Sequence, residues 1–217
     1  MKNLVIMSAM ALMAINANAE KVKFEISGVV ADSIKEVVVI VNNDKNSSQK
    51  VTVANGRFNA VGEAEKNDLL NVGHEINRGF NSLVAINDGQ PIKMNFVENT
   101  VSGSSENSAL GNQIKANAAD EGRMAILIKE YRELSKQNTA EADARIKEIM
   151  AEANAIEEKN MKASIEYIKA HKGDVTPVAF IQNVMYELSY NELAEIINPD
   201  VAYFNHPMVA KAKRLMD

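Results

Sequence analysis

The sequence has 217 residues with 24 basic and 29 acidic side chains, and its net charge of −5 argues against a nucleic-acid or anionic-membrane binder. It contains no cysteine, which excludes disulfide bonds, thiol catalysis and thiolate metal sites. A chain of this length can bury a core without covalent cross-links or a structural metal.

Residues 1–19 have the pattern of a secretory signal peptide. A charged start with Lys2 precedes an apolar run from Leu4 to Ile15, and Ala17-Asn18-Ala19 forms an Ala-x-Ala cleavage site. The run is short for a transmembrane helix, so an uncleaved anchor is the less favoured alternative. Because no cysteine follows for lipid attachment, we expect cleavage after Ala19 and export, which in a Gram-negative cell means the periplasm. No later apolar stretch is long enough to cross a bilayer.

Residues 20–104 are predicted to form an antiparallel β domain, either a sandwich or a barrel-like sheet. Apolar and polar residues alternate from Val22 to Val30, as in a half-buried strand. The unbroken run Val37–Val41 predicts a strand covered on both faces. Further short strands are expected, with turn residues between them, at Leu69–Val72, Leu83–Ile86, Ile92–Val97 and Thr100–Ser102.

Asn55-Gly56 predicts a two-residue β-hairpin turn, because both central positions of a type I′ turn need a positive φ. Folding the chain about this turn places Val53 opposite Phe58 and Val51 opposite Ala60 on one apolar face. The turn and the apolar pattern therefore agree in register. We expect residues 50–54 and 57–61 to pair as a hairpin.

After Gly103 the apolar spacing changes to three and four, which predicts an α-helical domain in residues 105–217 and an α+β fold for the whole chain. The second long helix is expected to begin after Thr139 as its N-cap and to end before Gly173 as its C′ residue. Gly122 argues against an unbroken first helix. The first helix would present one apolar face made of Leu110, Ile114, Ala118, Ala125, Ile128 and Tyr131.

A heptad-like stripe follows the second helix, made of Ala142, Ile146, Ile149, Ala153, Ile156, Asn160, Ala163, Tyr167 and Ala170. Such a stripe can form an intermolecular coiled coil or pack within the chain against the first helix. We favour a long intramolecular helical hairpin, because the linker Ser135–Thr139 is short. Asn160 within the stripe would fix the register of this packing at some cost in stability.

A helical array of shorter segments is predicted after the hairpin. Thr176-Pro177 has the form of an N-cap followed by proline at the first helical position. Ser189 and Glu192 form a capping box, and Asn198-Pro199 would stop that helix. Asn205-His206-Pro207 would start the last short helix.

The three histidines lie far apart in the sequence, and none has a neighbour at metal-ligand spacing. His171 near a helix end is interpreted as a favourable contact with the helix dipole, and His206 as a helix entry. His74 lies in the polar segment Gly73–Gly79, which we interpret as a surface loop, with a site there as the alternative.

No catalytic, cofactor-binding or metal-binding residue can be assigned from the sequence. Phosphate-binding glycine loops and nucleophile motifs are absent. A pair of catalytic carboxylates would need a separation that only the fold sets. We interpret the acids of the second helix as lying on solvated faces beside lysines; they are Glu148, Glu152, Glu157 and Glu158.

Several stretches resemble an exported family, the domain of unknown function 4369. In that family a β-rich module is followed by a helical segment, and often by a thioredoxin-like domain of the TlpA/ResA thiol–disulfide type. The similar stretches are Phe24–Gly28 with Val37–Val41, Val51–Gly62, Leu83–Ile92, Val101–Asn107, Ala163–Leu188 and Asn205–Val209. The present sequence departs from that pattern at Asp217, where the relatives' thioredoxin-like domain would begin, and it has no Cys-x-x-Cys motif. No catalytic residue is therefore carried over from the family.

These observations predict a non-enzymatic periplasmic module that binds an unknown protein or a small ligand, without a cofactor. One alternative is an accessory partner that acts in trans with a separate thioredoxin-like reductase. Another is an uncharacterised hydrolase that depends on carboxylates or on His74. A further alternative is an oligomeric scaffold built on the stripe of residues 142–170.

Overall fold

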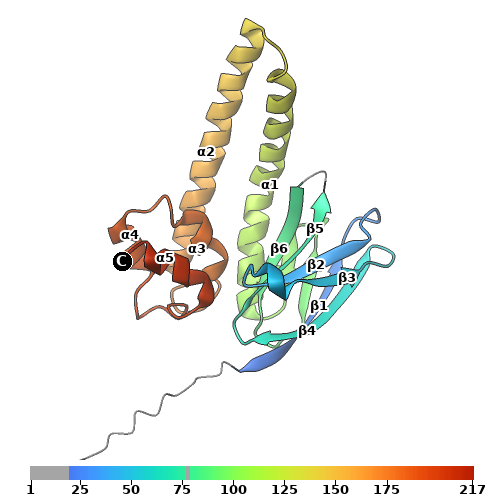
Figure 1. Ribbon diagram of the computed structural model, residues 1–217, viewed down its shortest axis with the longest axis vertical. Helices are drawn as coiled ribbons and strands as arrows, with labels where there is room; N and C mark the ends of the chain where they lie inside the picture. The colour runs from blue at the N-terminus through green and yellow to red at the C-terminus, as the bar shows by residue number, and fades with distance from the viewer. Residues whose placement is uncertain (1–19, 77–78) are drawn as a thin grey trace, which may run out of the picture.

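A computed structural model describes residues 20–76 and 79–217 (Figure 1). The predicted signal peptide, residues 1–19, lies outside the described residues, as do Asn77 and Arg78. The described part contains eight strands followed by five α-helices, which confirms the α+β class with an N-terminal β region and C-terminal helices.

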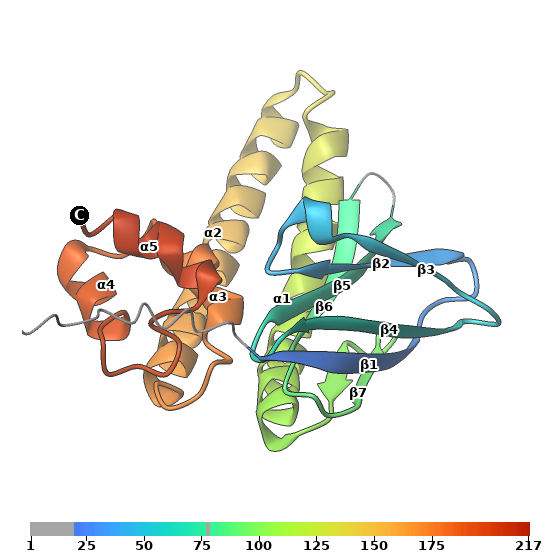
Figure 2. The same ribbon diagram turned by 60° about the horizontal axis from the view of Figure 1, so that its bottom comes forward.

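Two four-stranded sheets pack face to face as a sandwich (Figure 2). The strand order is β4-β1-β7-β8 in one sheet and β3-β2-β5-β6 in the other. Neighbouring strands are antiparallel, except that β1 and β7 are parallel. The strands are β1 Lys21–Val29, β2 Glu36–Val41, β3 Gln49–Thr52, β4 Arg57–Glu65, β5 Leu69–Ile76, β6 Gly79–Ile86, β7 Ile92–Asn95 and β8 Thr100–Ser102.

The period-2 pattern of β1 is confirmed, because Phe24 and Ile26 are buried between the sheets. The prediction for Val37–Val41 was wrong in part. Val37 and Val39 are fully buried, but Val38 and Ile40 are only half-buried. Their side chains lie on the outer face of the second sheet, since successive side chains of a strand point to opposite faces.

The turn at Asn55-Gly56 forms, but the predicted hairpin does not extend beyond it. Both residues have positive φ, 51° and 68°, and Ala54 and Arg57 exchange two backbone hydrogen bonds of 2.9 and 3.0 Å. From there β3 pairs with β2 and β4 pairs with β1, in different sheets. The turn therefore connects the two layers. Val53 and Phe58 are still buried in one core, because they approach it from opposite layers.

The helices form one long hairpin and a compact C-terminal array. They are α1 Ser105–Leu134, α2 Ala140–Ala170, α3 Val178–Val184, α4 Tyr190–Ile196 and α5 Ala210–Arg214, with 3₁₀ turns η1 Lys45–Ser47 and η2 Pro207–Val209. Helix α1 is continuous through Gly122. The predicted N-cap Thr139 and the capping box of Ser189 with Glu192 are confirmed.

Helices α1 and α2 pack against each other within one chain, as the favoured interpretation of the stripe predicts. Three ion pairs join them: Arg123 with Glu152, Arg145 with Glu130, and Lys159 with Asp120. Glu152 thus pairs with Arg123 of the facing helix instead of a lysine, while its side chain stays 39% exposed, in keeping with the predicted solvated face.

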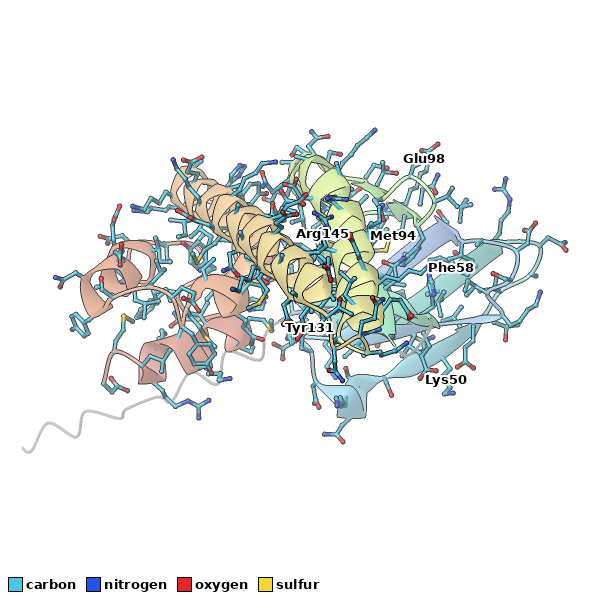
Figure 3. The ribbon with its side chains drawn as sticks, turned by 90° about the horizontal axis from the view of Figure 1, so that it is seen from above. Lys50, Phe58, Met94, Glu98, Tyr131 and Arg145 are labelled. Atoms are coloured by element: carbon cyan, nitrogen blue, oxygen red, sulfur yellow. The ribbon has the colours of Figure 1, made fainter. Side chains whose placement is uncertain are left out.

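The apolar face of α1 differs from the prediction in its distal half. Leu127 is fully buried, whereas Ile128 and Tyr131 are 44% and 43% exposed. The hairpin projects beyond the sheets there, and Figure 3 looks onto its tip, with Tyr131 and Arg145 labelled. Only α2 covers α1 in this region, so a narrower set of side chains is buried.

Two predicted helix ends were also wrong. Helix α2 is capped by His171, and Gly173 does not have the positive φ of a C′ glycine. Helix α3 begins one residue later than expected, after Pro177. The hydroxyl of Thr176 is fully buried and bonds to Asp174 and Tyr167 instead of capping α3.

The N-terminal half of α1 joins the sandwich to the helices. The buried Asn107 side chain accepts a hydrogen bond from the Ile86 N–H at 2.8 Å and donates one to the Ile86 carbonyl at 2.9 Å. Gly111 lies directly on the backbone of Val101 in β8. Ile114 packs against both the sandwich core and the helical core. The two cores are therefore adjacent and share α1.

A second connection runs from the C-terminal array to the turn between β4 and β5. His206 Nδ1 accepts a hydrogen bond from the Met208 N–H at 3.1 Å, and its Nε2 lies 3.1 Å from the Asn67 carbonyl. This pattern requires a neutral ring with the proton on Nε2. Burial lowers the pKa of His206, against the opposing effects of the Asn67 hydrogen bond and the Asp68 charge.

The His206 contact predicts a pH dependence of stability. Because its pKa is lowered in the fold, the unfolded chain binds the proton more readily, so this contribution is complete above the ordinary pKa near 6.5 and is lost as the pH falls below it. We expect wild type to lose more unfolding free energy than His206→Asn between about pH 7 and pH 5. Urea unfolding across this range measures the difference. Equal pH slopes for the two proteins would contradict the assignment.

The close approach at Gly111 predicts a large effect of one added methyl group. A Cβ at Gly111 would lie 2.0 Å from the Val101 carbonyl oxygen, so Gly111→Ala should lower the unfolding free energy by about 2 kcal/mol or more. Gly122→Ala is the matched control, because no atom lies within 4 Å of its added Cβ. That control should raise stability by about 1 kcal/mol, as alanine favours a helix. Denaturant unfolding of both variants tests this, and a stable Gly111→Ala protein would show that α1 can move away from β8.

Candidate functional site

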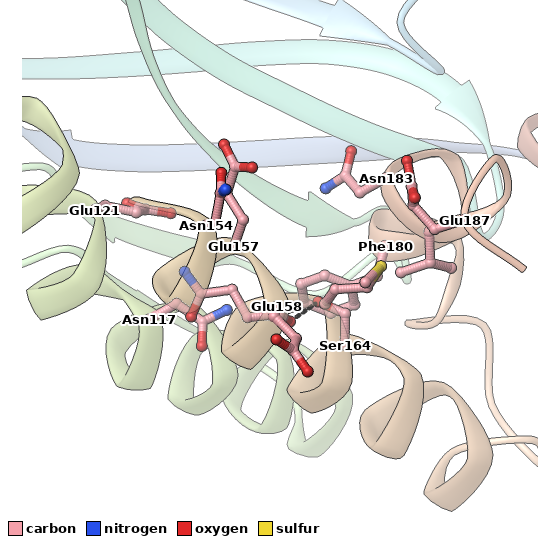
Figure 4. Close-up of a pocket in the computed structure, with 12 residues that line it drawn as sticks. Asn117, Glu121, Asn154, Glu157, Glu158, Ser164, Phe180, Asn183 and Glu187 are labelled. Carbon is pink, nitrogen blue, oxygen red and sulfur yellow. Dashed lines mark hydrogen bonds between the residues drawn. The ribbon is translucent and has the colours of Figure 1, made fainter. Parts of the chain in front are cut away.

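A groove of about 550 Å³ lies between α1, α2 and α3 (Figure 4). This volume is within the range of small-molecule and peptide-side-chain sites. Its rim carries four carboxylates and its walls four amides, above a mainly apolar floor. The carboxylates are Glu121, Glu157, Glu158 and Glu187, the amides Asn117, Asn154, Asn160 and Asn183, and the floor residues Met161, Ser164, Phe180 and Val184.

Helical spacing brings these side chains together. On α1, Asn117 and Glu121 are four residues apart, and on α2 the groove residues run from Asn154 to Ser164 in steps of about three and four. Phe180 of α3 closes one end, where its ring lies 5.1 Å from that of Tyr167 in an edge-on arrangement. Three separate helices thus supply the groove, and none of them carries it alone.

The groove is electrostatically one-sided, because no Lys, Arg or His is among the described residues that line it. Of the bases nearest in sequence, Lys159 is paired with Asp120 at 2.7 Å and Arg123 with Glu152, whereas Lys162, next to Met161 on α2, is exposed and does not line the groove. None of the four groove carboxylates has an ion-pair partner within residues 20–76 and 79–217. Desolvation within the groove raises the pKa of Glu121, although the residue as a whole is exposed.

Asn160 contributes an unpaired polar atom to the groove. Its side-chain oxygen is buried and has no hydrogen-bond partner among the described residues. Its backbone carbonyl accepts a bond from the Ser164 hydroxyl at 2.9 Å. The prediction placed Asn160 in the helix–helix stripe as a register device, and the structure shows that it also lines the groove.

The sequence predicted a surface loop at His74, and this prediction was wrong. His74 lies in β5, is 5% exposed, and packs its ring 5.3 Å from that of Phe96. The period-2 series Leu70, Val72, His74 was the available signal, because all three point to the buried face. Strands β5 and β6 take up most of the predicted loop, and the remainder lies outside the described residues.

The other histidines are structural. His171 caps α2, stacks on Tyr167 with ring centroids 4.1 Å apart, and places Nδ1 2.9 Å from Asp174 Oδ2. His206 enters η2 as predicted. No group of three or more His, Asp and Glu side chains in the described part of the chain is arranged to hold a metal ion.

Sequence reasoning did not find the groove. Glu157 and Glu158 were interpreted as members of a solvated face, yet both border the groove with Asn154 and Met161. Their spacing on one side of α2 was the available signal. The contribution of α3 could not be anticipated, because its position depends on how the chain turns after α2.

Comparison with protein-family models, with curated proteins and with solved structures finds no match to this chain. The resemblance to the domain of unknown function 4369 therefore stays a prediction. No helix within the described ranges is long and apolar enough to cross a membrane.

The unpaired oxygen of Asn160 predicts that an apolar replacement stabilises the fold. A buried polar atom without a partner costs free energy, so Asn160→Leu should raise the unfolding free energy by about 1 kcal/mol. Asn154→Leu, an exposed amide of the same groove, is the control and should change stability by less than about 0.5 kcal/mol. Urea unfolding measures both. A destabilised Asn160→Leu protein would mean that the amide makes a bond important for folding.

Proposed function

We propose that the chain is an exported, non-catalytic binding module that holds its ligand in the groove between α1, α2 and α3. The observation that carries this proposal is the composition of the lining: four carboxylates and four amides surround a mainly apolar floor, and none of the described lining residues is a base. Elsewhere along the hairpin the facing acids Asp120, Glu130 and Glu152 are each paired with a base of the other helix. Acids left unpaired around a hollow are suited to an external partner.

The fold supports a binding role in a second way. Each wall of the groove is anchored at a distance from it: α1 by Asn107 on β6, and the C-terminal array by His206 on the β4–β5 turn. A groove held open by a rigid scaffold loses little conformational freedom on binding. Export to the periplasm remains part of the proposal, because it depends on the predicted signal peptide.

The carboxylate-dependent hydrolase is the second candidate, and one observation favours it. Glu121 has a raised pKa, as a general acid beside an ionised carboxylate would. His74 is buried against Phe96 and gives no support to the histidine-dependent version. A turnover that persists after Glu121→Gln would count against this candidate. No structural feature favours action in trans with a reductase over other partners, and that role stays a prediction.

A bulky residue at the rim tests the proposed function. Asn183 is exposed on α3, so Asn183→Trp should fill the groove without disturbing the core. Asn191→Trp, an exposed asparagine of α4 outside the groove, is the matched control. We expect affinity capture with the tagged full chain from the native envelope fraction to recover a ligand with wild type and with Asn191→Trp, and to lose it with Asn183→Trp.

The outcome that contradicts the proposal is equally clear. If every species that co-purifies with wild type is also recovered with Asn183→Trp, the groove is not the binding site. Circular dichroism and thermal unfolding of the two variants show whether both keep the wild-type fold, so that a loss of ligand can be assigned to the blocked groove.

A further inference from the structure

We propose that the occupant of the groove is a short, extended peptide segment that carries Lys or Arg side chains. This inference rests on the proposed function and names the chemical class of the ligand. It is drawn from three features of the lining, which are the carboxylates, the amides and the apolar floor.

The carboxylates of the groove favour a ligand with positive charge. Glu157 and Glu158 of α2, Glu121 of α1 and Glu187 after α3 all line the same hollow, and the side chains of Glu157 and Glu158 point in different directions from α2 (Figure 4). Four acids without an ion-pair partner among the described residues leave the lining negatively charged, and an ammonium or guanidinium group placed among them would offset this charge. Guanidinium groups bind carboxylates through two parallel N–H bonds, which favours arginine.

The asparagine amides of the groove are suited to hydrogen bonds with a peptide backbone. Each asparagine side chain offers both a donor and an acceptor, as a peptide group does. Asn117, Asn154 and Asn183 come from three different helices, so amides line the groove on several sides. The unpaired oxygen of Asn160 is one acceptor that a peptide N–H could satisfy after a small side-chain movement. A simple polyamine could donate to the carboxylates and to the amide oxygens, but it has no acceptor for the amide N–H groups.

The apolar floor of the groove is suited to the methylene stem of a ligand's Lys or Arg side chain. Met161, Phe180 and Val184 form an apolar base beneath the ring of acids. Lysine and arginine combine a charged head with an apolar methylene stem, and they lie along apolar surfaces in just this way. A compact inorganic cation would not use such a floor. The three features thus agree on one class of ligand.

Isothermal titration of the full chain with defined probes tests the inference. The probes are the capped peptide acetyl-Ala-Arg-Lys-Ala-amide, the same peptide with glutamine at both basic positions, and spermidine. We expect the basic peptide to bind at least about tenfold more tightly than either of the others. Its affinity should fall as salt is raised, because the carboxylates are partly exposed.

Charge-removing variants locate the binding. The double variant Glu157→Gln with Glu158→Gln should lower the affinity for the basic peptide by about tenfold or more. The matched control is Glu141→Gln with Glu166→Gln, which removes the same charge from exposed positions of α2 outside the groove and should leave the affinity within about twofold. Equal losses in the two double variants would overturn the inference, because they would report only the net charge.

Other results would overturn the ligand class without removing the proposed function. If the glutamine peptide bound as tightly as the basic peptide, the positive charges would not contribute to binding. If spermidine bound as tightly as the basic peptide, the amides would not contribute to recognition. If Asn183→Trp abolishes capture of the natural ligand while the basic peptide fails to bind wild type, the groove remains the binding site and only the cationic class is wrong. Undiminished binding of the basic peptide to Asn183→Trp would place that peptide elsewhere.

Discussion

The contact between the N-terminal half of α1 and the sandwich is the constraint on which the rest of the structure depends. Asn107 supplies both a donor and an acceptor to the backbone of Ile86, so its amide acts as one more residue of a strand beside β6. One turn later, Gly111 lets the helix backbone meet that of Val101 in β8. A side chain at this position would force the two apart, and Ile114 could no longer reach both cores.

This constraint explains why a two-part sequence folds with adjacent cores. Leu69 and Ile86 belong to strands, yet they are buried in the helical core. The hairpin then carries the chain out along α1 and back along α2, and α3 follows after the short segment of residues 171–177. The His206 contact with Asn67 ties the last segment to the sandwich. The three helices that line the groove are therefore placed by contacts outside it, which leaves the carboxylates and exposed amides of its rim free for chemistry other than packing.

The groove also shows how the chain distributes its charge. Where α1 and α2 face each other, acids are paired with bases across the hairpin, as with Arg145 and Glu130. Pairing of this kind is worth little at an exposed surface, but it avoids leaving like charges together. Around the groove this pairing is not found, and the acids lie near Phe180 and Val184 without an ion-pair partner among the described residues. Unpaired carboxylates give no stability to the free protein, but a bound cationic ligand would supply their missing partners.

The sequence by itself determined those features that depend on neighbours a few residues away. The alternation in β1, the positive-φ turn at Asn55-Gly56, and the caps at Thr139 and Ser189 could all be predicted for that reason. The α+β order and the intramolecular hairpin followed from the same local patterns. Tertiary structure alone decided that β3 and β4 leave the turn for different sheets, that His74 is buried, and that α3 closes the groove. These outcomes rest on contacts between residues distant in the chain, whose free energy depends on how whole layers pack and not on any local pattern.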